Sequence, residues 1–134
     1  MHPLYAKAHA LSSRVIGAAI EVHRLKGAGL IEGIYERCLM RELELQGIQA
    51  LNQVPVKIEY KGLVFEELLR LDICVENCLI VENKAVEKLL PLHKAQLLSY
   101  MKLLNIPLGL LINYHEPLLK NGLVRLILEG ADQP

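Results

Sequence analysis

The sequence predicts one α/β domain in which helices flank a mixed sheet, with the element order α-α-β-β-β-β-α-β-β. Three observations predict this class: apolar residues recur at helical spacing in the first third, polarity alternates through the middle, and a helix precedes a short apolar run near the C-terminus. No repeat or linker interrupts the 134 residues. We therefore expect a single domain over 1–134, with a core from about 12 to 128.

Two helices open the predicted fold. Ser12 or Ser13 would cap the first, which ends at the glycine-rich stretch 27–29. The second runs from 30 to about 46, and Gly47 would end it.

Strands follow these helices. Residues 54–60 and 63–67 alternate in polarity around the turn at 61–62, and a fourth strand is expected over 79–86. The apolar face of the third strand would consist of Leu69, Leu71, Ile73 and Val75.

One more helix and two strands complete the prediction. Pro91 suits the first turn of a helix that runs to Leu104. Residues 108–113 are typical of a buried strand, and the turn at 121–122 leads to a last strand over 123–128.

Composition and charge exclude several classes of protein. Apolar residues make up 52% and charged residues 22%, with 15 basic and 15 acidic side chains, which excludes a disordered chain. The longest uncharged stretch, 103–114, is shorter than the roughly 20 residues of a membrane helix. No leader pattern opens the chain, and three cysteines cannot all pair with one another. We therefore expect a soluble, cytoplasmic protein without a membrane partner.

The hairpin around Cys78 carries the strongest candidate site. If its loop is 76–78, the antiparallel register places Asp72 opposite Glu82 on one face, with Lys84 two residues further on. Facing carboxylates repel unless a proton or a cation neutralises them, and hard oxygen ligands suit Mg²⁺ or Mn²⁺. The lysine would then orient an attacking water. A solvated sheet face with a simple ion pair explains the same spacing.

A polar stripe lies on the predicted third helix. His93, Gln96 and Tyr100 share it, and a right-handed crossover would bring it beside the carboxylates. A solvated helix face with a half-buried tyrosine is the alternative. The stripe expected to face the core consists of Leu97, Met101 and Leu104.

Glu32 lies near the start of the predicted second helix. With Gly29 as the N-cap, its carboxylate would satisfy first-turn amides and the helix dipole. Because Tyr35 and Glu36 follow on the same helix face, Glu32 would alternatively reach a metal held by the sheet. Helix geometry leaves both roles open.

Together these motifs resemble the GxxExxY family of the PD-(D/E)xK nuclease-like superfamily, over roughly 12–128. The naming motif stands as Gly29-Leu30-Ile31-Glu32-Gly33-Ile34-Tyr35, and 16–23 before it is similar to the opening helix of the family. The other matching motifs are Asp72 for the metal-binding aspartate, Glu82-Asn83-Lys84 for (D/E)xK, and Gln96-Leu97-Leu98-Ser99-Tyr100 for QxxxY.

The resemblance implies a restriction-endonuclease-like fold and metal-dependent hydrolysis of phosphodiester bonds in DNA or RNA. Asp72 and Glu82 would ligate Mg²⁺ or Mn²⁺, helped by the backbone carbonyl of Asn83. Lys84 would position the nucleophilic water.

The resemblance also implies accessory roles. Glu32 would act as an acid on the metal or its water shell, and Gln96 and Tyr100 would line the site. His93, one turn before Gln96, would contact a phosphate. Asn83 departs from the family pattern, in which this position is usually apolar, and a buried amide at this place needs partners.

Two other functions fit the sequence less directly. A catalytically degenerate module that binds nucleic acid or a protein partner agrees with the net charge of zero. Residues 1–26 still hold four basic side chains against one acidic, and this segment would meet phosphates. A plain scaffold has no reason to place two acids opposite each other. A homodimer would suit a nuclease of this size that acts on two strands.

Overall fold

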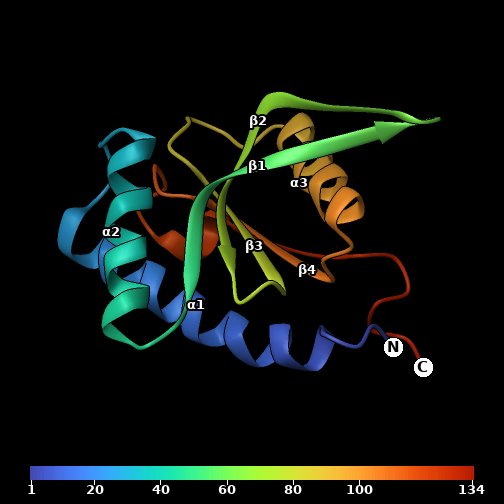
Figure 1. The fold of residues 1–134 in the computed structure, drawn as a ribbon. Coiled ribbons are helices and arrows are strands. Elements are labelled where there is room, and N and C mark those ends of the chain that lie inside the picture. The colour runs from blue at the N-terminus through green and yellow to red at the C-terminus, as the bar shows by residue number, and fades with distance from the viewer.

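The computed structural model describes the backbone of residues 1–134 and the side chains outside 67–69 (Figure 1). Its elements are α1 (Tyr5–Lys26), α2 (Glu32–Leu45), β1 (Ala50–Tyr60), β2 (Leu63–Val75), β3 (Leu79–Lys84), α3 (Pro91–Leu104), β4 (Leu108–Asn113), the 3₁₀ helix η1 (Leu119–Gly122) and β5 (Leu123–Ile127). No helix in this described part of the chain is long and apolar enough to cross a bilayer.

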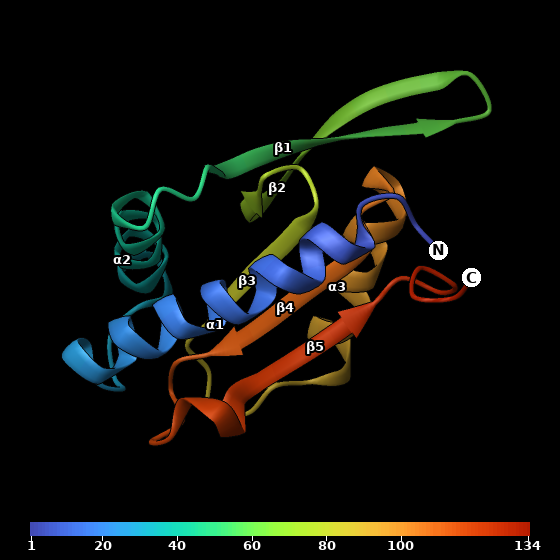
Figure 2. The same ribbon diagram turned by 90° about the horizontal axis from the view of Figure 1, so that it is seen from below.

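The strands form one mixed sheet in the order β1-β2-β3-β4-β5. Only β3 and β4 run parallel; the other neighbouring strands are antiparallel. α1 and α2 pack on one face of the sheet and α3 packs on the other (Figure 2). The predicted class, a mixed sheet flanked by helices, is confirmed.

The second and third predicted strands are one continuous strand, β2, so the sheet has five strands and not six. The sequence from Phe65 to Leu71 contains no Gly, Pro, Asn or Asp that would turn the chain. Pairing with β1 shifts register between Pro55 and Lys57.

This shift accompanies a change in which face of β2 is apolar. Ile73 and Val75 pack under α1 and α2, as expected for one face of the strand. Leu71 instead lies in the cluster under α3, so the expected apolar face is not continuous. Leu69, which we also expected on that face, lies outside the described side chains.

Four predicted boundaries were wrong, and one of them is the start of β1, which lies at Ala50 and not at 54. α1 begins at Tyr5 and not after Ser12, because Ala8 and Leu11 are also buried against the sheet. Ser12 lies inside the helix, where its hydroxyl donates to the His9 carbonyl at 2.7 Å. α2 begins at Glu32 with Ile31 as its N-cap, so Gly29 is not the cap. β3 ends at residue 84, two positions early.

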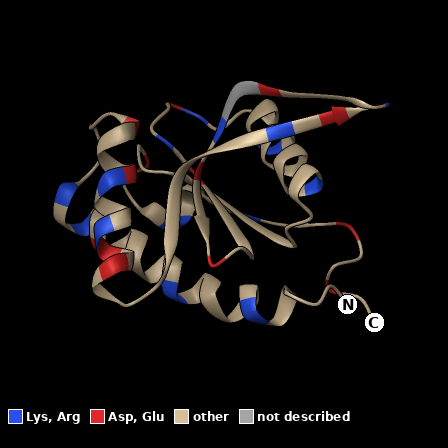
Figure 3. Ribbon diagram, in the orientation of Figure 1, with Lys and Arg blue, Asp and Glu red and all other residues tan. Residues whose placement is uncertain are grey.

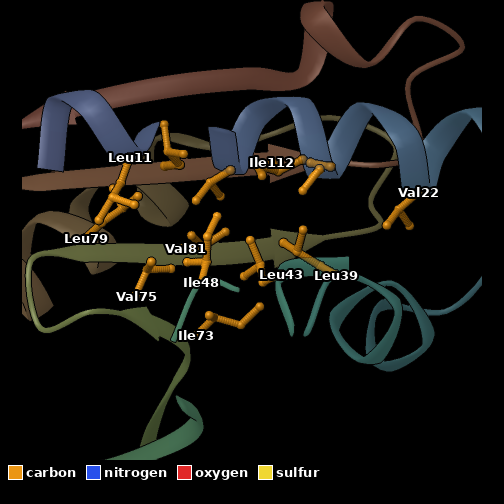
Figure 4. Packing of buried hydrophobic residues seen from close by; sticks show 14 of the residues in the cluster. Leu11, Val22, Leu39, Leu43, Ile48, Ile73, Val75, Leu79, Val81 and Ile112 are labelled. Carbon is orange, nitrogen blue, oxygen red and sulfur yellow. The ribbon is translucent and has the colours of Figure 1, made fainter. Parts of the chain in front are cut away.

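Two apolar clusters hold the layers together. The larger one lies between the sheet and the α1/α2 pair, and Figure 4 shows residues such as Leu11, Leu39, Val81 and Ile112 interlocking there. Each fully buried side chain of this kind contributes about 1.5–3 kcal/mol. The smaller cluster lies under α3, where a Cβ on Gly109 would sit 2.8 Å from the Met101 sulfur. The glycine therefore allows α3 to approach β4 closely.

Candidate active site

Asp72 and Glu82 lie where the pairing of β2 with β3 ends. The two strands are paired as far as Ile73 and Val81, in the register that the sequence predicts. Beyond this point, hydrogen bonds from backbone amides to side-chain carboxylates replace the backbone–backbone hydrogen bonds between the two strands. The Asp72 amide donates to Oε1 of Glu82 at 3.1 Å, and the Asn83 amide donates to Oδ2 of Asp72 at 2.8 Å. Both carboxylates are thus fixed between the strand ends by backbone amides of the facing strand.

Burial dominates the electrostatics of this pair. Only 6% of Glu82 is exposed, and burial raises its pKa to about 8, with the negative charge of Asp72 adding to the effect. Burial also raises the pKa of Asp72 to about 6, although the hydrogen bond from the Asn83 amide opposes the shift. The pair therefore carries less than two full negative charges at neutral pH when no cation compensates it.

Lys84 and Glu32 meet at the end of β3. Nζ of Lys84 lies 3.9 Å from Oε1 of Glu32, the first residue of α2. The negative charge of Glu32 also contributes to the raised pKa of both Asp72 and Glu82. Its carboxylate therefore faces the sheet, which favours a role at the site beyond interaction with the helix dipole.

Tyr100 brings α3 to the same place. It is 5% exposed, and burial, followed by the charge of Glu82, raises its pKa. Gln96 is exposed and donates from Nε2 to the Tyr100 hydroxyl at 3.2 Å. These two residues of the QxxxY motif lie one turn apart and interact beside the carboxylates.

The remaining positions of α3 differ in their placement. His93 is half-buried, and its Nδ1 accepts a hydrogen bond from the Leu90 amide at 2.9 Å, so this histidine caps its own helix. Leu97 and Met101 are fully buried, as we expected. Leu104 is 36% exposed and not buried, because it is the last residue of α3.

Glu36 is a buried acidic neighbour to which the sequence analysis gave no role. It accepts hydrogen bonds from Nδ2 of Asn52 at 3.3 Å and from Nε2 of Gln53 at 2.8 Å. Its negative charge contributes to the raised pKa of Asp72. Because Glu36 follows Glu32 by one helical turn, the sequence indicates that both carboxylates lie on the same face of α2. The side-chain amides that bind Glu36 belong to residues of β1. The spacing of residues within α2 does not reveal this contact.

Tyr35, the last residue of the GxxExxY motif, fixes the approach to α2. Its hydroxyl donates to the Gly27 carbonyl at 2.5 Å and accepts from the Leu30 amide at 3.1 Å. Between these residues Gly29 has a φ of +105°, which an L side chain rarely adopts. Tyr35 thereby positions the loop that ends at Glu32.

The donor set suits a hydrated hard cation. Within the described residues, no three His, Cys, Asp or Glu side chains are grouped so that they could hold a metal ion by themselves. Mg²⁺ needs only one or two carboxylates, because it keeps several of its waters. Asp72, Glu82 and the Asn83 carbonyl match this requirement. A cation between the carboxylates would also offset the desolvation that raises both pKa values.

The fold and this cluster agree with the class that the sequence motifs resemble. A family model described as the PD-(D/E)XK nuclease superfamily matches residues 9–126, and the chain therefore belongs to that superfamily. Comparison with curated proteins and with solved structures gives no significant match.

Proposed function

We propose that this protein is a metal-dependent nuclease of the GxxExxY type that hydrolyses phosphodiester bonds in DNA or RNA. The observation that carries the proposal is the carboxylate pair of half-buried Asp72 and buried Glu82, held by the backbone amides of Asn83 and Asp72 beside Lys84. Burying two like charges is unfavourable unless a proton or a cation neutralises them. A divalent cation that also binds a phosphate substrate would neutralise the two carboxylates and give the pair a function.

The chain's own groups then have distinct roles. Asp72, Glu82 and the Asn83 carbonyl would hold Mg²⁺ or Mn²⁺, which neutralises phosphate charge and lowers the pKa of a bound water. Lys84 orients the attacking water, and Glu32 at 3.9 Å keeps the ammonium in place.

The residues of α3 act on the substrate side. The Tyr100 hydroxyl accepts its hydrogen bond from Gln96, so its own hydrogen remains available for a carboxylate or phosphate oxygen. His93 uses Nδ1 as a helix cap, which leaves Nε2 as the atom for a phosphate contact.

A module that binds nucleic acid or a protein partner without cleavage is the second candidate. The net charge is zero, and Figure 3 shows both basic and acidic residues on α2 and along the β1–β2 hairpin. This distribution gives a weak attraction for polyanions. Asn83 in place of an apolar residue also favours a weakened site.

A cleavage assay separates the two candidates. Single- and double-stranded DNA and RNA are incubated with the protein and Mg²⁺ or Mn²⁺, and Asp72→Asn and Lys84→Met are each compared with the wild type. We expect each variant to lose roughly 100-fold or more in rate, because metal and lysine act on the transition state. The matched controls Asp132→Asn and Lys102→Met change exposed residues outside the site and should retain activity.

Calorimetry on the same proteins completes the test. Mg²⁺ should bind the wild type and not Asp72→Asn. A wild type that cleaves none of the substrates would favour the binding module. Site variants that cleave as fast as the wild type would place the activity elsewhere.

A further inference from the structure

The outer half of β1, residues 57–60, is an unprotected edge of the sheet. β1 is the terminal strand of the sheet and pairs with β2 alone. Figures 1 and 2 show the β1–β2 hairpin projecting beyond the helices. Large apolar side chains near its turn are exposed: Tyr60 by 63%, Leu63 by 60% and Val64 by 56%. Such an edge offers backbone amides and carbonyls to another strand.

The inner half of β1 carries features that block strand addition. Pro55 has no amide hydrogen, and the pairing of β1 with β2 is irregular between Pro55 and Lys57. Gln53 has a positive φ of 52°, which further distorts this part of the strand. These features end at Lys57, so only the outer half is regular enough to accept a neighbour.

We propose that this outer half pairs with the same segment of a second copy of the chain, antiparallel and about a two-fold axis at Ile58. In that register Lys57 lies opposite Glu59 of the second copy, and Glu59 lies opposite Lys57 of the second copy. A two-fold axis makes both charge pairs form together. Opposite charges directly across an antiparallel pair are favourable, whereas like charges are not.

The other face of the segment supports the same register. Val56 is fully buried and Ile58 half-buried in the cluster under α3, whereas Tyr60 on the same side of the strand is exposed. In this register Tyr60 of each copy lies just beyond the paired residues 57–59, next to the irregular end of the other copy's segment at Val56, so its ring extends the apolar cluster across the interface. The exposed ring would then be covered.

Local contacts hold the charged residues in place. Oε1 of Glu59 accepts the Gly62 amide at 2.8 Å, which keeps the carboxylate at the edge and leaves its second oxygen for a lysine. Figure 3 shows the basic and acidic positions following each other along β1. A nucleic acid would not favour this alternation, whereas an antiparallel copy of the same sequence matches it residue by residue.

Sedimentation equilibrium of the full chain over a range of concentrations tests the pairing. The wild type should form dimers, and Lys57→Glu and Glu59→Lys should each weaken dimerisation tenfold or more. The double exchange, Lys57→Glu with Glu59→Lys, should restore it, because the charge pairs then reform with reversed polarity. Lys102→Glu on α3 is the control and should dimerise like the wild type.

Two results would overturn the proposal. One is a wild type that stays monomeric at every concentration, and the other is a dimer that neither single variant weakens. Glu59→Lys also loses the bond to Gly62, so circular dichroism must show that the hairpin is intact in this variant. Lys57→Glu keeps that bond and gives the independent measurement. Neither result depends on nuclease activity.

Discussion

The two faces of the sheet at β3 differ in whether their buried polar groups have partners. On the α3 side, Glu82 accepts a backbone amide and Lys84 lies near Glu32. On the α1/α2 side, the side-chain amide of Asn83 and the hydroxyl of Tyr114 are buried, and neither has a hydrogen-bond partner among the described residues. Two helices close the second face, whereas one helix covers the first. We therefore expect the chemistry on the α3 face and, on the other face, a loss of stability from the buried polar groups that have no partner.

The largest expected effect is the pH dependence that the α3 face gives to stability. The pKa values of Asp72, about 6, and Glu82, about 8, are above those of the unfolded chain. The folded state therefore retains protons that the unfolded state has lost between about pH 4 and pH 8. Stability from the protonated pair is present at low pH and is lost as the pH rises through 6 and then 8.

Urea unfolding of the metal-free protein at pH 5 and pH 8.5 measures this loss. We expect the free energy of unfolding to fall by roughly 5 kcal/mol, most of it from Glu82, whose pKa is raised further. Glu82→Gln should remove most of the fall, and Mg²⁺ should restore stability to the wild type at the higher pH. Asp132→Asn, an exposed control, should behave like the wild type. An equal fall in Glu82→Gln and the wild type would contradict the raised pKa of Glu82.

Local sequence predicts the placement of the carboxylates well, for a physical reason. The short loop at 76–78 permits one register, and period-two alternation then fixes which residues share a face. The sheet class follows from the same alternation. The burial of Glu36 could not be predicted in this way, because its partners Asn52 and Gln53 lie on a strand that the local spacing does not connect to α2.

Packing and local caps explain where the structure differs from local sequence patterns. α1 extends upstream because Ala8 is buried against the sheet, which outweighs the preference of Ser12 for a cap. His93, which we expect to contact a phosphate, also accepts the Leu90 amide as a helix cap, a role that has no common sequence signature. Tyr35 belongs to a motif that suggests chemistry, yet its bonds to Gly27 and Leu30 are structural.

Asn83 and Asn113 are both buried but differ in whether their side chains have hydrogen-bond partners. Asn113 pairs with Lys84 across the sheet, and its side chain bonds the amide and carbonyl of Val86 and the amide of His115. Asn83 has no such bonds among the described residues. Asn113→Leu should lower the free energy of unfolding by about 2–3 kcal/mol, and Asn83→Leu should raise it by about 1–2 kcal/mol.

Chemical denaturation of both variants checks this prediction. Mg²⁺ binding should survive in Asn83→Leu, because our proposal uses only the backbone carbonyl at this position. If the two variants were equally destabilised, the Asn83 amide would have to be paired in solution.

The smallest effect separates two stacked tyrosines on the α1/α2 face. Tyr35 and Tyr114 lie with ring centroids 4.4 Å apart and planes inclined by 7°, but only Tyr35 has hydrogen-bond partners among the described residues. Tyr35→Phe removes both of its bonds and should lower the free energy of unfolding by about 1 kcal/mol. Tyr114→Phe should leave it unchanged or slightly higher, because it removes a buried hydroxyl without a partner and keeps the stacking. Urea unfolding compares the two, and hydrogen exchange at the Leu30 amide should accelerate only in Tyr35→Phe. Equal losses of stability in the two variants would contradict a net contribution from the hydrogen bonds of Tyr35 to Gly27 and Leu30.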